Sequence, residues 1–182
     1  MITPTSPRKL QIDLDELAFV FHSSEPMIES YLDLQDGRII MVKIDTRYQL
    51  DQIYDEYSLD TAEELDLPLI LDRLDISDWE RQELLEADEV EAGLDERYIR
   101  IPKAVSRQEY QDIEEFIETV QDPRLKEHLE QAISGREAFR GFKDVLLSYP
   151  EEQERWFAFQ NGRQRQRVLE WLAGEGIEAE VD

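Results

Sequence analysis

GREAFRGFKDVLLSYPEEQERWFAFQNGRQRQRVLEWLAGEGI, residues 135–177, is the stretch in which aromatic and basic side chains interleave most densely. On a helix over residues 135–149, an apolar face forms from aromatic and aliphatic side chains at helical spacing. A basic stripe lies beside it at i, i+4 and i+7, formed by Arg136, Arg140 and Lys143. The spacing predicts an amphipathic helix with a cationic flank.

A second helix is predicted after Pro150, with Trp156 and Arg163 on one face. Arg167 extends that face if the helix runs through Gly162, although the pair Asn161-Gly162 can also break it. Two helices joined near Pro150 turn their basic residues toward one place. The hypothetical ligand-binding residues are therefore Arg140, Lys143 and Arg163, with Trp156 as the wall that stacks a base.

The same basic residues have a structural alternative. Arginine beside aromatic rings can stack on them, pair with an internal carboxylate or receive an external phosphate. Acidic side chains close in sequence are available for internal pairing, namely Glu137, Asp144 and Glu170. In a chain with twice as many acids as bases, we expect internal pairing, and we expect the aromatic stripe to belong to the core.

Upstream, two further helices are predicted from their first turns. Ser106 and Glu109 have the spacing of a capping box, and Asp122-Pro123 places proline where its missing N–H costs nothing. Strands are predicted over residues 30–34, 38–43 and 97–101, the first two joined by a turn at Asp36-Gly37. The expected fold class is α+β: a small three-stranded antiparallel sheet with a predominantly helical C-terminal bundle. Residues 1–105 hold an N-terminal helix, the sheet and an acidic helical segment, and residues 106–182 hold the bundle, together forming one compact domain.

Other segments carry weaker signals. Residues 14–22 predict a short buried helix, at whose end His22 as a cation would complement the macrodipole. A helix over residues 77–93 begins with a Ser77–Glu80 capping box and buries a thin stripe containing Trp79. Residues 65–71 are expected to be broken by proline, and the ends, residues 1–9 and 178–182, to be a short tail and frayed.

The net charge is −24, and it is unevenly distributed. Residues 51–96 hold 18 acids and only Arg73 and Arg81. Such acidity is first of all expected to keep the protein soluble, and the alternative is that this segment binds a basic protein partner. Duplex DNA would meet average repulsion, so it is not expected as a partner. There is no cysteine, no apolar run long enough to span a membrane and no signal-peptide pattern, and we expect a cytoplasmic protein.

Catalytic motifs are missing from the sequence. No Gly-x-Ser-x-Gly elbow, phosphate-binding loop or dinucleotide turn is present, so no catalytic residue and no cofactor is assigned. Two carboxylate clusters of the kind that hold hard cations occur, but such clusters arise by chance at this acid content: Asp33, Asp36 and Asp45, and Asp13, Asp15 and Glu16. The preferred hypothesis is a non-enzymatic acidic interaction or regulatory protein. The alternative is a protein that binds an anion, a nucleotide or RNA phosphate between its C-terminal helices.

Several of these stretches together resemble a known family. Residues 132–144, the run Trp156–Phe159 with Arg163, and Glu170-Trp171-Leu172 look like the C-terminal signature of bacterial uncharacterised protein family 0158. The Asp36-Gly37 turn and residues 97–102 resemble its earlier parts. The resemblance implies a bacterial, cytoplasmic protein and supplies no activity. Members carry a second arginine where this chain has Gly141, which would make a shared basic site poorer here.

Arg163 allows the two hypotheses to be separated. If its role is structural, Arg163→Ala lowers the melting temperature, by an amount that corresponds to about 3–5 kcal/mol for a truly buried pair. Arg163→Lys then restores little, since an ammonium does not reproduce the guanidinium fork. If the residue binds a ligand, the alanine variant keeps its stability and loses stabilisation by anions. Thermal denaturation with and without phosphate distinguishes the outcomes, and we expect the structural one.

Overall fold

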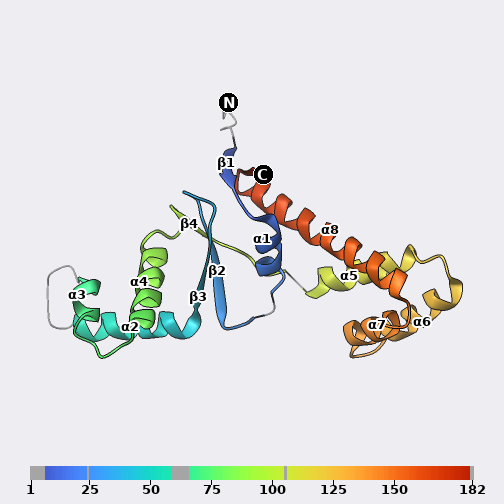
Figure 1. The fold of residues 1–182 in the computed structure, drawn as a ribbon, viewed down its shortest axis with the longest axis horizontal. Helices are drawn as coiled ribbons and strands as arrows, with labels where there is room; N and C mark the ends of the chain where they lie inside the picture. The colour runs from blue at the N-terminus through green and yellow to red at the C-terminus, as the bar shows by residue number, and fades with distance from the viewer. Residues whose placement is uncertain (1–6, 24, 59–65, 105, 181–182) are drawn as a thin grey trace. The chain divides into compact units, whose positions relative to one another are not determined.

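The computed structural model describes residues 7–23, 25–58, 66–104 and 106–180. It is an α+β fold with a three-stranded antiparallel sheet and a helical C-terminal part, as the sequence predicts (Figure 1). No helix within the described ranges is both long and apolar enough to cross a membrane. The elements are β1 (Arg8–Gln11), α1 (Leu14–Phe21), β2 (Ile28–Asp33), β3 (Ile39–Lys43), α2 (Ile44–Ser58), α3 (Leu67–Leu71), α4 (Asp78–Ala92), β4 (Tyr98–Arg100), α5 (Ser106–Glu118), α6 (Pro123–Ile133), α7 (Ala138–Leu146), α8 (Pro150–Gly174) and β5 (Ile177–Glu180).

The chain divides into two compact units that interleave along the sequence. The helical unit consists of α1 and of α5 to α8, residues 14–22 and 103–177. The sheet unit consists of β1, β2, β3, β4 and α2 to α4, residues 8–13 and 23–102, together with most of β5. The α1 helix thus groups with the C-terminal helices, and folding of the whole chain as one compact domain stays a prediction.

The three predicted strands form one sheet in the order β3-β2-β4. Tyr31 of β2 lies opposite Ile40 of β3 and opposite Arg100 of β4, with both pairs antiparallel. The turn between β2 and β3 contains Gly37 at φ +80°, the positive value that makes glycine the favoured residue there. The Asp36-Gly37 turn signal is therefore confirmed.

A second, two-stranded sheet pairs β1 with β5 in parallel. The expectation of a tail up to Lys9 and of frayed residues after Ile177 was wrong for both described strands. Each strand buries only one apolar side chain, Leu10 in β1 and Ile177 in β5, so neither shows the alternation that identifies a strand in a sequence. Lys9 and Glu180 add an exposed ion pair at 3.7 Å.

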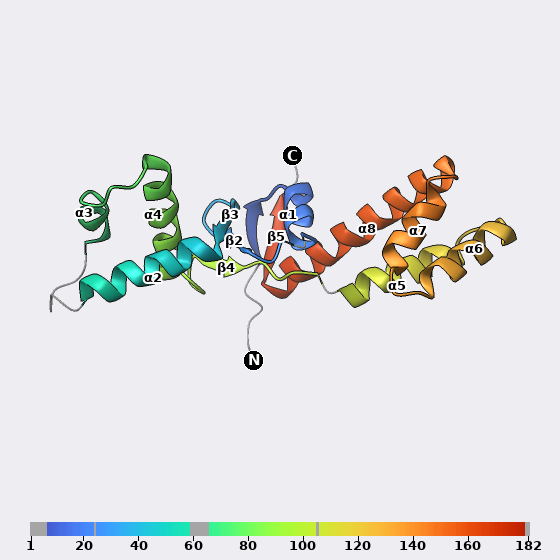
Figure 2. The ribbon, with the colours of Figure 1, turned by 90° about the horizontal axis from the view of Figure 1, so that it is seen from below.

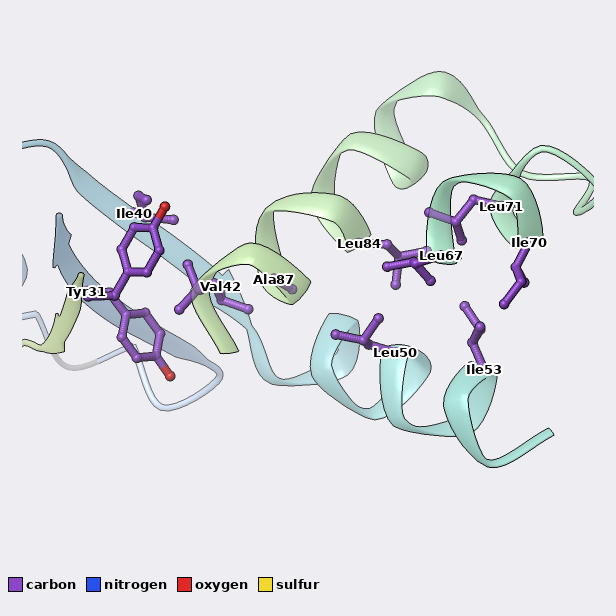
Figure 3. Packing of buried hydrophobic residues seen from close by; sticks show 12 residues of the cluster. Tyr31, Ile40, Val42, Leu50, Ile53, Leu67, Ile70, Leu71, Leu84 and Ala87 are labelled. Carbon is purple, nitrogen blue, oxygen red and sulfur yellow. The ribbon is translucent and has the colours of Figure 1, made fainter. Parts of the chain in front are cut away.

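The core of the sheet unit runs from one face of the sheet, between α2 and α4, to α3. Figure 3 shows Val42 of β3 close to Ala87 of α4, with Leu84, Leu50 and the α3 leucines continuing the same cluster. The α3 helix is not broken by Pro68, because this proline occupies the first turn and Asp66 caps the helix by accepting from Leu69 N–H.

The capping box that opens α4 is present, and Gly93 follows its last residue. Leu84, Ala87 and Val90 form the buried stripe of α4. Trp79 was expected in that stripe, but its side chain is 60% exposed. The prediction failed because helical spacing does not say which side of a helix meets the sheet.

The core of the helical unit joins α5, α6, α7 and α8, which lie together in both views (Figure 2). Trp156 of α8 is 3% exposed and packs edge-on against Phe116 of α5 and Phe142 of α7, with ring centroids 5.2 and 4.8 Å away. The α6 helix begins at Pro123, as predicted, and Asp122 caps it by accepting from the N–H groups of Arg124 and Leu125. The capping box at Ser106 stays a prediction, since that side chain lies outside the described residues.

One detail of the helical unit differs from expectation. The α7 helix begins at Ala138 rather than Gly135, so Arg136 precedes the helix and the basic stripe is shorter. A protonated His22 would complement the macrodipole at the end of α1. Burial lowers the pKa of His22, and its Nδ1 lies 3.0 Å from the Ala18 carbonyl oxygen. The sequence did not decide whether the helix after Pro150 breaks at Asn161-Gly162. In the structure, α8 runs through both residues.

Two glycines give a matched test of backbone conformation. Gly37→Ala should destabilise the protein by at least about 2 kcal/mol, because positive φ disfavours a side chain and its Cβ would lie 2.1 Å from the Gln11 carbonyl oxygen. Gly162→Ala should stabilise it by up to about 1 kcal/mol, since Gly162 is inside α8 and no described atom lies within 4 Å of its added Cβ. Urea unfolding measures both changes. Equal destabilisation by the two substitutions would contradict this assignment.

Candidate interaction surface

Trp79 and Lys43 form the most distinctive exposed contact of the sheet unit. Trp79 lies in the first turn of α4, directly after its cap, and Lys43 is the last residue of β3. The Lys43 Nζ lies 4.3 Å from the centroid of the Trp79 ring and 2.7 Å from the Glu83 Oε1. A large aromatic ring is thus held at the surface by a cation, with 60% of the side chain still exposed.

Neighbouring side chains extend this contact into a strip. Trp79, Glu83 and Glu86 recur at i, i+4 and i+7 and therefore lie along one face of α4. On β3, Met41 lies two residues before Lys43, on the same face of the strand, and is 53% exposed. We call these five residues the Trp79 strip. It combines exposed apolar surface with carboxylates.

The charge around the strip is strongly negative. The sheet unit has 27 Asp and Glu against nine Lys and Arg, a net charge of −18, which leaves −6 for the helical unit. Most of the bases in the sheet unit are paired with its own carboxylates. These include Lys43 with Glu83, Arg47 with Glu29, Arg81 with Asp72, Arg97 with Asp33 and Arg100 with Glu29.

Many carboxylates of the sheet unit are left without a counter-charge. Within the ranges that the structure describes, the following acids form no ion pair and are largely exposed: Asp45, Asp51, Glu56, Asp75, Asp78, Asp95 and Glu96. Glu86 in the strip is half-buried and likewise forms no ion pair among the described residues. These acids can therefore attract a cation without first breaking an internal pair, whereas Glu83 of the strip is already paired with Lys43.

Glu29 shows why the internal bases are not available to other ligands. Its carboxylate accepts hydrogen bonds from Arg47 at 2.5 Å and from Tyr31 at 2.9 Å, and it pairs with Arg100. Burial favours the neutral carboxyl, but these donors outweigh it and hold the pKa of Glu29 below its ordinary value. The cavity nearby, lined by Tyr31 and Arg47 among others, has a volume of about 10 Å³ and holds at most one water molecule.

The four residues predicted to bind a ligand lie in different surroundings. Arg140 is exposed on α7 and lies near Glu137 and Asp144 of its own turn, at 3.6 and 3.8 Å. Lys143 is exposed on the same helix. Trp156 is buried in the core, so it offers no face to a base. An anion site over these residues stays a prediction, and no observation favours it.

Arg163 pairs with carboxylates other than the three predicted from nearby sequence. It forms an ion pair with Glu115 and lies 3.9 Å from Asp112, both on α5, while its guanidinium lies over Phe159. The Asp112 carboxylate is nearly buried and is held more closely by Arg167, at 2.5 Å. The Arg163 side chain is 36% exposed, so the cost of removing it belongs to the range of exposed pairs, about 0.2–1 kcal/mol.

Two acids of the first carboxylate cluster considered for a metal are bound by arginines. Asp33 is fully buried and is bound by Arg97, and Asp36 pairs with Arg38 at 2.6 Å. Among the described residues, no group of three or more His, Asp or Glu side chains has an arrangement suited to a metal ion. The Trp79 strip was missed because its members come from two segments, and only the folded chain brings them together.

Comparison with known proteins places the chain in a family. Residues 69–181 match the Uncharacterised protein family (UPF0158). The chain is 27% identical to a UPF0158 protein of Pseudomonas aeruginosa over 94% of its own length and 87% of that protein. It is 25% identical to a UPF0158 protein of Chlamydia trachomatis, over 93% of its own length but 42% of that longer protein. No solved structure matches the chain. The matched region covers more than half of the sequence, including α4 and all the helices of the C-terminal part, and the chain therefore belongs to the Uncharacterised protein family UPF0158.

Proposed function

We propose that this bacterial protein is a non-enzymatic, cytoplasmic interaction protein whose sheet unit binds a basic segment of a partner protein. The observation that carries the proposal is the Trp79 strip, in which an exposed tryptophan ring already accepts one cation and is surrounded by carboxylates. The role is regulatory if the bound segment of the partner has another function that this binding blocks.

The chemistry of the strip favours a cationic ligand. The Trp79 ring accepts the Lys43 ammonium on its π-face, a contact worth about 0.5–1 kcal/mol at an exposed site. Glu83 and Glu86 offer carboxylates to lysine or arginine side chains of a partner. Met41 adds apolar surface that can cover the methylene stem of such a side chain. Together these groups recognise a basic and partly apolar peptide.

Solubility alone does not account for this surface. A protein made acidic only to stay soluble has no need to concentrate the charge in one unit, yet the net charge is −18 in the sheet unit and −6 in the helical unit. Nor does solubility explain why the large apolar side chains of Trp79 and Met41 are exposed, since exposed apolar side chains lower solubility. Both features are expected of a surface that binds a cationic partner.

Neutralising the strip should weaken binding of a basic peptide. The probe is a 12-residue peptide that alternates Arg or Lys with Val or Thr, and its affinity is measured by isothermal titration calorimetry at low and at physiological salt. Glu83→Gln with Glu86→Gln should weaken binding by about fivefold per carboxylate, because each contact contributes roughly 1 kcal/mol in water. Wild-type affinity should also fall with salt.

The matched control is Glu151→Gln with Glu154→Gln on α8, which removes the same charge from the helical unit at a spacing of i, i+3. It should leave the affinity within about twofold. Equal weakening by both double variants would mean that only the net charge matters, and the proposal would be wrong. Failure of the wild-type protein to bind the peptide at low salt would also overturn it.

A further inference from the structure

The hydrogen-bond pattern of the sheet identifies which backbone groups of β3 are unused. The N–H of Asp33 donates to the Arg38 carbonyl at 2.9 Å, and the N–H of Ile44 donates to the Met27 carbonyl at 2.9 Å. In an antiparallel ladder, bonded and non-bonded pairs alternate. With Tyr31 opposite Ile40, the residues of β3 that bond to β2 are therefore Ile40 and Val42. The N–H and C=O groups of Ile39 and Met41 point away from β2.

The two edges of this sheet differ in how they are covered. Next to β4, the N–H of Asp95 donates to the Tyr98 carbonyl at 2.9 Å, and Leu94 forms a bridge to Tyr98. Along β3, no described residue forms a backbone hydrogen bond with the outward groups of Ile39 or Met41. At β4 only Arg100 is left with outward groups that no described residue bonds, whereas both outward residues of β3 are left so. The longer open edge is therefore the one at β3, and an open edge is a template for one more strand.

The side chains beside this edge specify the occupant. The side chain of Val42 points to α4. Because side chains alternate along a strand, that of Lys43 leaves β3 on the opposite face. The Lys43 ammonium still reaches Trp79 and Glu83 of α4. Trp79 and Glu83 thus lie beside β3. A second copy of the chain is disfavoured at this edge, because two sheet units of net charge −18 repel one another. A basic segment is attracted instead.

We propose that an extended basic segment of a partner adds to the sheet as a fourth strand along β3, bonding to the backbone of Ile39 and Met41. The inference rests on the proposed function and names the form in which the partner is bound. Successive side chains of an added strand alternate between the two faces of the sheet. Its basic side chains would reach Trp79, Glu83 and Glu86, while the backbone bonds make binding depend on an extended conformation.

Met41→Pro tests the backbone contact directly. Proline removes the N–H that points outward and leaves the bonds between β3 and β2 intact, because Met41 does not bond to β2. The control is Met41→Ala, which removes the same side chain and keeps the N–H. With the alternating peptide, Met41→Pro should weaken binding at least tenfold and Met41→Ala by about threefold or less. Circular dichroism checks that both variants are folded.

Amide hydrogen exchange gives a measurement on the wild-type protein, so the test does not depend on the proline variant folding. Binding of the peptide should slow exchange at Met41 at least tenfold and change Ile40 and Val42 little, since those amides already bond to β2. A peptide of the same composition arranged with helical periodicity should bind at least tenfold more weakly than the alternating one. Slowed exchange with a preference for the alternating peptide supports strand addition.

Three results would overturn the inference. If both Met41 variants bind like the wild type, or if exchange at Met41 is unchanged by saturating peptide, the strand does not add. In that case the carboxylate variants still decide whether the proposed function stands. If light scattering after gel filtration shows a dimer that Met41→Pro abolishes, the edge is occupied by a second copy of the chain instead.

Discussion

The carboxylate of Asp33 is fully buried at the end of β2, and a buried charge destabilises a fold unless it is matched. Arg97, which immediately precedes β4, bonds to both of its oxygens, the shortest contact being 2.8 Å, and the N–H of Gln35 donates to it at 2.8 Å. Arg97 also donates to Glu89 near the end of α4 at 2.6 Å. This one arginine therefore ties the hairpin turn, the third strand and the covering helix together, and the sheet unit depends on it.

The two units use their cations differently, and that difference bears on function. In the helical unit, Arg163 and Arg167 both turn to the nearly buried Asp112, so cations gather around one acid. In the sheet unit, Arg97 and Arg47 are likewise drawn inward, but far more acids are present than bases to match them. The pairing that stabilises the interior thus leaves the exterior negative. An acidic surface is a direct result of how the fold satisfies its buried charges.

The parts of this structure that follow from local chemistry were predictable from the sequence. The turn at Gly37, the cap at Ser77 and the proline after Asp122 each depend on a few adjacent residues, and all are present. Contacts across the chain were not predictable in the same way. Asp33 and Arg97 are 64 residues apart, and Asp112 and Arg167 are 55 apart. With 44 acids and 20 bases, the sequence permits very many pairings, and only the packing of the elements selects among them.

The pairing of β1 with β5 has a consequence for the order of folding. The hairpin of β2 and β3 closes a short loop, whereas β1 and β5 lie near opposite ends of the described chain, with the whole helical unit between them in sequence. Closing so long a loop costs conformational entropy, and contacts of high sequence separation form slowly. On the ribosome, β1 emerges before the segments of the helical unit, and β5 emerges after them. β1 must therefore wait unpaired until all of those helices have been synthesised.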